Sequence, residues 1–209
     1  MTLEGEVTMQ ASKWTNDGLF SSKSNEWGTP MWMIELVEKE YGPIELDVAA
    51  SDTNNKALVY FTKEDDVIDS GYDWRTLYKK KMRELRMVGE LRGNIWCNPP
   101  YGRDIGKWME MCVHESFEPR FYVSRSGKYK DVFCLVFART DTKWFHEWVV
   151  PYAEAVYFVK GRMKFEHEDG RNGAAPAPSM LVHYSGCNVE PCRFGTITKE
   201  GIFDSRYDG

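Results

Sequence analysis

Residues 132–137 read Val-Phe-Cys-Leu-Val-Phe, and this unbroken apolar run constrains the fold more than any other stretch of the chain. A strand in which polar and apolar residues do not alternate is buried on both faces, which is typical of parallel sheets covered by helices on each side. Shorter apolar runs predict five more strands, at 44–49, 57–61, 94–97, 155–159 and 179–184. We expect the run at 179–184 to be the last strand. The pattern favours an α/β fold with a mostly parallel central sheet.

Helical patterns separate these runs. One helix is expected to begin at Thr29 and Pro30, because threonine is a good N-cap and proline suits the first helical turn. Residues 75–91 predict a basic helix. Its expected inner face is Leu77, Met82, Leu85 and Val88. Further helices are expected at about 105–116 and at 144–149, whereas residues 117–130 alternate aromatic and basic residues as in a hairpin or loop.

The length of 209 residues and the hydrophobic fraction of 42% predict one globular domain. Residues 1–24 are polar and lack periodicity, so we expect a flexible arm. The domain itself is expected to span residues 25–185, followed by a polar C-terminal tail at 186–209.

Five cysteines, an odd number, lie scattered through the chain and indicate reduced thiols in a cytoplasm. Cys187, Cys192 and His183 fit no zinc-binding pattern, so we expect no metal. No apolar run reaches the roughly 18 residues of a membrane span, and the N-terminus has no signal-peptide pattern. We therefore expect no contact with a membrane.

The tetrad Asn98-Pro99-Pro100-Tyr101 directly follows the strand expected at 94–97. Pro99 and Pro100 have no backbone N–H, so this turn offers carbonyl acceptors rather than donors. The side chain of Asn98 adds another carbonyl oxygen, and Tyr101 adds a flat aromatic face. Such a site suits a planar base with an exocyclic amine. The alternative is a Pro-Pro turn that Asn98 merely caps.

This arrangement would explain how the exocyclic amine of adenine, a poor nucleophile, becomes reactive. The side-chain oxygen of Asn98 and the carbonyl of Pro99 bind the two amino hydrogens of adenine, which favours a pyramidal and more nucleophilic nitrogen. The same dipoles stabilise the positive charge that develops as this nitrogen attacks an electrophilic methyl group. Tyr101 stacks on the base and orients it. The tetrad is therefore the candidate catalytic set.

Charge is distributed unevenly along the chain. The net charge is −5, yet residues 75–130 contain 13 Lys and Arg against 6 Asp and Glu. A basic sector on an acidic protein suits a surface that faces phosphates. A solvated helix face is the alternative. Because the sector flanks the tetrad on both sides, residues 75–92 and 117–130 are candidate DNA-recognition insertions.

Two loops are expected at one edge of the sheet. Ligands of open α/β sheets bind beyond the carboxyl ends of the strands. The loop after Asp47 and the loop after Cys97 both fall there. We therefore expect the two loops to form one site.

Six sequence blocks occur in a fixed order: 26–30 (Glu-Trp-Gly-Thr-Pro), 46–51 (Leu-Asp-Val-Ala-Ala-Ser), 94–102 (Asn-Ile-Trp-Cys-Asn-Pro-Pro-Tyr-Gly), 139–145 (Arg-Thr-Asp-Thr-Lys-Trp-Phe), 161–165 (Gly-Arg-Met-Lys-Phe) and 175–179 (Ala-Pro-Ala-Pro-Ser). In these blocks the chain resembles the phage-type, Dam-like DNA adenine-N6 methyltransferases. The resemblance covers about residues 26–184. It implies a single-domain, Rossmann-like methyltransferase fold that uses S-adenosylmethionine, and a protein of the host cytoplasm if a phage encodes it.

The resemblance also implies which residues bind the cofactor. They are Thr29, Pro30, Asp47, Ala49, Ala50, Ser51, Asp65 and Asp66. The first two would line the methionine end, and the carboxylate of Asp47 would lie near the ammonium group. One of the last two, with Asp66 favoured, would bind the ribose or the adenine. The loop after Asp47 lacks the glycine-rich sequence that is usual in methyltransferases.

Double-stranded DNA is the implied partner, with the target adenine flipped out of the helix into the tetrad. The candidate DNA-binding residues are Lys79, Lys80, Lys81, Arg103, Arg125, Lys128, Arg139 and Arg162. The tetrad alone leaves other acceptors open, namely RNA adenine, the N4 amine of cytosine and protein glutamine. A non-catalytic nucleic-acid-binding protein of the same fold is the remaining alternative.

Overall fold

The computed structural model describes residues 27–117, 131–166, 173–186 and 191–204. Within them an eight-stranded sheet has the order β10-β9-β5-β8-β4-β3-β1-β2. Its strands are β1 (Ile44–Asp47), β2 (Val59–Tyr60), β3 (Asn94–Cys97), β4 (Val132–Phe137), β5 (Ala155–Val159), β8 (Ser179–Tyr184), β9 (Arg193–Thr198) and β10 (Gly201–Asp204). The sequence-based arm at 1–24 and the stretch 118–130 lie outside the described residues.

The sheet is mixed. β2, β1, β3 and β4 are parallel to one another, and β8 is antiparallel both to β4 and to β5. β9 is parallel to β5, and β10 is antiparallel to β9. Within this eight-stranded sheet, only β8 and β10 therefore oppose the common direction, and β6 (Lys164–Phe165) and β7 (Gly173–Ala174) form a separate antiparallel pair. The α/β class is confirmed. The sheet is parallel over the four strands that come first along the chain, β1 to β4.

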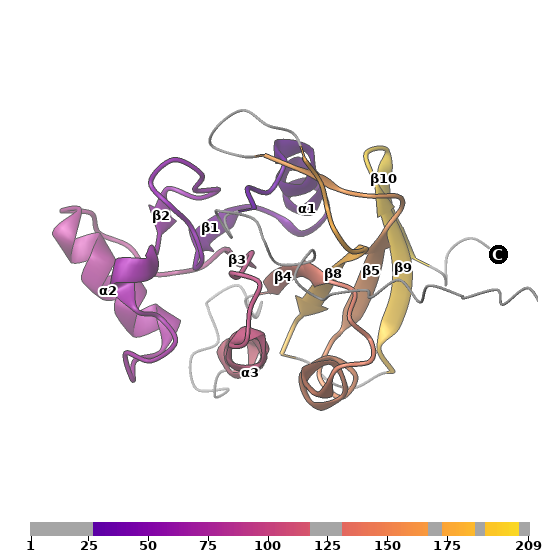
Figure 1. Ribbon diagram of the computed structural model, residues 1–209. Helices are drawn as coiled ribbons and strands as arrows, with labels where there is room; N and C mark the ends of the chain where they lie inside the picture. The colour runs from indigo at the N-terminus through magenta and orange to yellow at the C-terminus, as the bar shows by residue number, and fades with distance from the viewer. Residues whose placement is uncertain (1–26, 118–130, 167–172, 187–190, 205–209) are drawn as a thin grey trace, which may run out of the picture.

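Helices cover both faces of the sheet (Figure 1). α1 (Met31–Tyr41) lies on one face, whereas α3 (Ile105–Ser116) and a one-turn π-helix, η4 (Phe145–Val149), lie on the other. α2 (Trp74–Glu84) follows the outermost strand, β2. Two clusters of buried apolar side chains fill the spaces between these layers. The predicted buried strand is confirmed, because Val132 to Val136 are all fully buried.

Three sequence-based details are wrong. Ser179–Tyr184 is not the last strand, because β9 and β10 follow it within the stretch predicted as a tail. These two strands alternate poorly because they are mostly half-buried, β10 being the edge strand of the sheet and β9 its neighbour. The N-cap of α1 is Pro30 and not Thr29, whose hydroxyl is buried without a partner among the described residues.

The third error concerns the basic helix. α2 ends at Glu84, and the next residues turn away because Arg86 has a positive φ of 56°. Leu85 and Val88, predicted on the inner face, are instead 47% and 103% exposed. Leu77 and Met82 are buried as expected. Residues 85–93 therefore form a loop that leads into β3.

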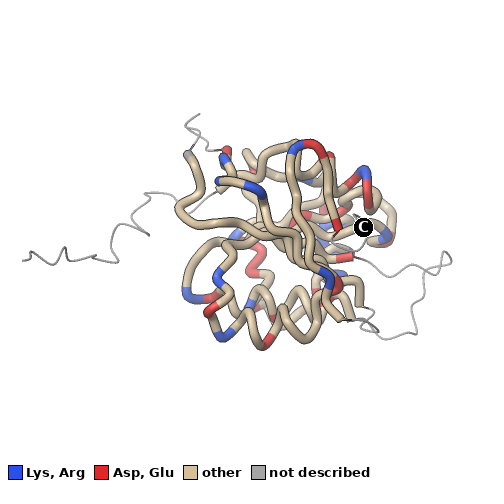
Figure 2. Tube along the Cα trace, turned by 90° about the vertical axis from the view of Figure 1, so that its right-hand side faces the viewer, with Lys and Arg blue, Asp and Glu red and all other residues tan. Residues whose placement is uncertain are grey.

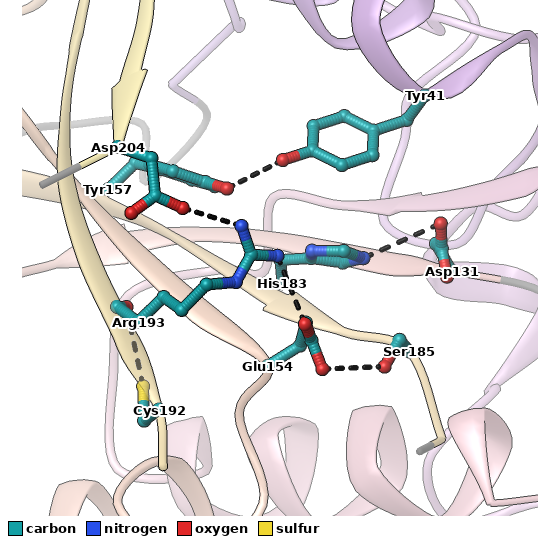
Figure 3. A network of polar contacts seen from close by, with 9 residues as sticks. All are labelled: Tyr41, Asp131, Glu154, Tyr157, His183, Ser185, Cys192, Arg193 and Asp204. Atoms are coloured by element: carbon teal, nitrogen blue, oxygen red, sulfur yellow. Dashed lines mark hydrogen bonds and ion pairs between the residues drawn. The ribbon is translucent and has the colours of Figure 1, made fainter. Parts of the chain in front are cut away.

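Polar side chains hold the C-terminal strands to the sheet at the amino-terminal edge of β4, β5 and β9 (Figure 3). The guanidinium of Arg193 donates to Glu154 at 3.0 Å and to Asp204 at 2.5 Å. The hydroxyls of Tyr41 and Tyr157 are 2.6 Å apart. This network joins β5, β9, β10 and the end of α1.

Candidate active site

A pocket of about 650 Å³ lies at the carboxyl ends of β1 and β3. After β1 the chain forms β2 on one side of β1, and it later forms β3 on the other side of β1. This reversal is a topological switch point, where ligands of open α/β sheets bind. The wall of the pocket consists of Trp27, Val48, Ala49, Ala50, Ser51, Asn54, Thr62, Lys63, Asp66, Val67, Ile68, Asp69, Asn98, Pro99, Pro100, Asp104 and Trp108.

The expectation that two loops form one site is confirmed by this wall. Ala49, Ala50 and Ser51 contribute from the loop after β1, and Asn98 and its two prolines contribute from the turn after β3. Of the two aspartates expected near the cofactor, Asp66 lines the pocket. The remaining predicted residues, Thr29, Pro30, Asp47, Asp65 and Tyr101, are not among the wall residues.

Asp47 supports the first loop from inside the protein. Its side chain is only 2% exposed, and its carboxylate accepts hydrogen bonds from the backbone N–H groups of Ala49 at 3.3 Å and Lys56 at 3.0 Å. Burial raises the pKa of this carboxyl to about 6, although the two N–H donors oppose the shift. The carboxylate therefore sets the shape of residues 49–56, and its contact with a cofactor stays a prediction.

A short 3₁₀ turn, η2 (Lys63–Asp65), shapes the loop after β2. The carboxylate of Asp65 accepts a hydrogen bond from the backbone N–H of Thr62 at 2.8 Å, and it forms an ion pair with Lys81 at 3.3 Å. Asp66 follows in the left-handed region, with φ of 47°, and is exposed at the pocket wall. Asp65 thus holds the turn, whereas Asp66 faces the pocket.

The amide of Asn98 contacts two neighbours. Its Nδ2 donates a hydrogen bond to the backbone carbonyl of Trp27, and the hydroxyl of Tyr101 donates to its Oδ1 at 3.3 Å. The same hydroxyl lies 3.4 Å from the carbonyl oxygen of Leu135. Burial raises the pKa of Tyr101 well above its usual value, so the phenol stays protonated.

The ring of Tyr101 in the tetrad belongs to a cluster of four aromatic rings. Tyr101 stacks on Phe137 with ring centroids 3.8 Å apart. Phe165 meets Tyr101, Phe137 and Trp27 edge to face, at centroid distances of 6.4, 6.4 and 5.4 Å. Sequence reasoning missed Trp27 and Phe137 as site residues. Trp27 lies within the first sequence block, whereas the only signal for Phe137 was its place at the end of the long apolar run.

Three predicted DNA-binding arginines lie on the side of the sheet where the pocket opens. Arg103, Arg139 and Arg162 are exposed on the loops that follow β3, β4 and β5. Figure 2 views the molecule from the side of β9 and β10, where basic and acidic residues are interspersed. The loops after β3, β4 and β5 present these three cations at the same edge of the sheet as the pocket.

The predicted lysines differ among themselves. Lys79 and Lys80 on α2 are exposed, whereas Lys81 is half-buried and paired with Asp65. Arg125 and Lys128 lie outside the described residues. The ion pair gives Lys81 a structural role beside the loop after β2.

Three cysteines meet beneath the tetrad although no metal-binding spacing was evident in the sequence. The sulfur atoms of Cys97, Cys112 and Cys134 all lie within 4.8 Å of one another, and all three residues are fully buried. The Sγ of Cys134 contacts the Sδ of Met109 at 3.6 Å. Burial raises the pKa of Cys97 and Cys112 well above the usual thiol value. The thiols of Cys97 and Cys112 therefore stay protonated, and we assign the three-cysteine cluster no ligand.

Comparison with known families decides which proteins this chain is related to. The family model described as DNA N-6-adenine-methyltransferase (Dam) matches residues 18–205. The chain belongs to this family. The Dam match covers most of the sequence, including β9 and β10, and so includes every described residue of the pocket. A search of curated proteins returned no significant match.

Membership of the Dam family confirms the family resemblance seen in the ordered sequence blocks. It associates the chain with DNA adenine methylation at the level of the family. Among the described residues, none of the helices has the length and apolar character that crossing a membrane requires.

Proposed function

We propose that this Dam family protein transfers the methyl group of S-adenosylmethionine to the exocyclic N6 amine of adenine in double-stranded DNA, within a Rossmann-like fold. The observation that carries this proposal is the position of Asn98, Pro99 and Pro100 in the wall of the switch-point pocket. An acceptor-rich turn there lies next to a cavity large enough for a nucleoside-sized ligand, since ligand pockets typically measure about 300–1,000 Å³.

The donor set of the pocket fits the cofactor. Asp66, Asp69 and Asp104 give the wall three carboxylates, which suit a ligand that carries an ammonium group, a sulfonium and ribose hydroxyls. S-adenosylmethionine supplies an electrophilic methyl group when it is bound. We place it between the loops after β1 and β2, which leaves the side of the pocket at Asn98 for the base.

The residues of the chain then bind and orient the adenine. Asn98 Oδ1 and the Pro99 carbonyl accept from the two amino hydrogens, and the face of Tyr101 opposite Phe137 stacks on the ring. The adenine nitrogen forms the new N–C bond while the bond between the methyl carbon and the sulfur breaks. One amino proton leaves afterwards to solvent, so no general base is required before attack.

Duplex DNA is the substrate that the surroundings of the pocket favour. The target base must leave the stack to reach the pocket. Arg103, Arg139 and Arg162 place three cations on neighbouring loops at the same edge of the sheet. Phosphate contacts of this kind position DNA without reading its sequence.

Transfer of labelled methyl groups to unmethylated duplex DNA, followed by nucleoside mass spectrometry, tests the proposal. The expected product is N6-methyladenine. Asn98→Ala should abolish it while the cofactor still binds, because the lost acceptor faces the target amine. N4-methylcytosine, or label only in RNA or protein, would assign the same chemistry to one of the other acceptors. Absence of methyl transfer to any of these acceptors, whether or not the cofactor binds, would indicate a non-catalytic nucleic-acid-binding protein.

A further inference from the structure

The orientation of the Asn98 amide follows from its contact with Trp27. An amide has one acceptor and one donor end, and the two are easily exchanged when a side chain is placed. The group opposite Asn98 is a backbone carbonyl, which carries no proton and can only accept. The amide atom that faces Trp27 must therefore be Nδ2. Oδ1 then points to the side of Tyr101, where the hydroxyl lies 3.3 Å away.

The segment that carries this carbonyl is fixed by a two-bond bridge. The N–H of Gly28 donates to the carbonyl of Glu166 at 2.8 Å, and the N–H of Glu166 donates back to the carbonyl of Gly28 at 2.8 Å. The approach is so close that a Cβ on Gly28 would lie 2.8 Å from the oxygen of Glu166. Glu166 also pairs with Lys56, whose side chain is only 6% exposed, at 3.4 Å.

We propose that the backbone carbonyl of Trp27 is the positioning group that makes Asn98 present its oxygen, and not its NH₂, to the amine that is to be methylated. The Gly28–Glu166 bridge holds this carbonyl in place. The inference rests on the proposed function, because it concerns how the proposed catalytic residue is oriented. A flipped amide would direct two N–H donors at an amine that also has two N–H donors.

Replacing Asn98 by aspartate tests whether the orientation of the side chain matters, or only the presence of a hydrogen-bond acceptor at this position. An ionised carboxylate has no donor, so one of its oxygens would face the Trp27 carbonyl without a proton between them. A neutral carboxyl group restores the pattern of the amide, because its O–H donates to Trp27 and its C=O accepts from the substrate. Activity of Asn98→Asp should therefore depend on protonation of the new side chain.

Other titratable groups around the pocket are common to both proteins. They are Tyr101 in the same turn, Asp66 and Asp69 after β2, Asp104 and Lys107 at the start of α3, and Lys56 and Glu166 at the bridge. Because these groups are the same in both proteins, the ratio of variant to wild-type activity removes their contribution.

The first test measures single-turnover methyl transfer to duplex DNA by wild type and Asn98→Asp. The pH runs from 5.5 to 8.5, about three units, because partial burial raises the pKa of a carboxyl group and the range should cover its titration. We expect the ratio of variant to wild-type rate to be small at high pH and to rise about tenfold for each unit of falling pH while the carboxylate predominates. A ratio that does not change with pH, with an active wild type, would overturn the inference and leave the proposed function intact. A wild type without transfer would overturn both.

The second test displaces the bridge. Gly28→Ala should lower the single-turnover rate about tenfold or more, because the added Cβ forces Gly28 away from Glu166 and so displaces the adjoining Trp27 carbonyl. Gly106→Ala is the matched control, since its Cβ meets nothing closer than 3.7 Å in α3. Urea unfolding of both variants verifies that they are folded. A folded Gly28→Ala variant with the wild-type rate would contradict the proposed role of the bridge.

Discussion

The ring of Tyr101 stacks on the ring of Phe137, with centroids 3.8 Å apart and planes inclined by 11°. One face of the tyrosine is therefore covered by the protein, and only the other can receive a base. Phe137 ends β4, directly beside the strand that carries the tetrad, and Phe165 meets both rings edge to face. The stack fixes the plane of the Tyr101 ring, against which the proposed mechanism places the adenine.

Phe137→Leu should lower methyl transfer while the protein stays folded. Leucine keeps much of the volume but removes the aromatic stack, and aromatic pairs contribute about 0.5–1.5 kcal/mol beyond burial, equivalent to roughly two- to tenfold in rate. The measurement is the single-turnover rate with saturating cofactor. Phe158→Leu is the matched control, because Phe158 stacks on Phe194 at the far strands and is 37% exposed. Equal rates for both variants would mean that the stack does not orient Tyr101.

Replacing Arg103, Arg139 and Arg162 together by glutamine should weaken binding to duplex DNA of any sequence. Each lost phosphate contact should reduce the slope of log K against log salt by about one. Fluorescence anisotropy over a salt series measures this slope. Lys39→Gln is the control, since Lys39 lies in the last turn of α1, at the opposite edge of the sheet. An unchanged slope in the triple variant would show that DNA approaches the pocket by another surface.

The central strands and the site edge were predictable because they depend on local pattern. β3 and β4 begin and end as their apolar runs do, and the carboxyl-edge rule placed Ala49 to Ser51 beside Asn98. β9 and β10 were missed because strands at and next to the edge of a sheet bury too little to show a regular pattern. The Trp27–Asn98 contact could not be predicted at all. It joins positions 71 residues apart through a backbone carbonyl, which leaves no trace in side-chain periodicity.

The buried Asp47 makes stability depend on pH. Its pKa is about 6 in the folded protein, above its ordinary value of 3.8. Between these values the folded protein binds a proton that the unfolded chain has lost, so the free energy of unfolding falls as pH rises and stays reduced above pH 6. The difference amounts to about 3 kcal/mol.

Urea unfolding of wild type and Asp47→Asn between pH 4 and pH 7 measures this contribution. The asparagine cannot ionise, so the stability of wild type relative to Asp47→Asn should fall by about 2.4 kcal/mol between pH 4 and pH 7, which is most of the full difference. A relative stability that does not change with pH would mean that Asp47 has an ordinary pKa and that the loop it supports leaves it accessible to water.

Arg193 should stabilise the C-terminal strands without taking part in the reaction. Its side chain is 19% exposed and pairs with Glu154 and Asp204, which are 28% and 10% exposed. Arg193→Met leaves two partly buried carboxylates without their cation, so we expect a loss of about 2–3 kcal/mol in the free energy of unfolding, somewhat less than for a fully buried pair.

Arg92→Met is the control for this variant, because Arg92 and Glu90 form an ion pair that is 73% and 74% exposed and screened by water. Urea unfolding measures both variants. Methyl transfer by folded Arg193→Met should equal that of the wild type, because the network of Figure 3 lies at the amino-terminal edge of the sheet and the pocket at the carboxyl edge. A rate that fell together with stability would indicate that β9 and β10 also control the site.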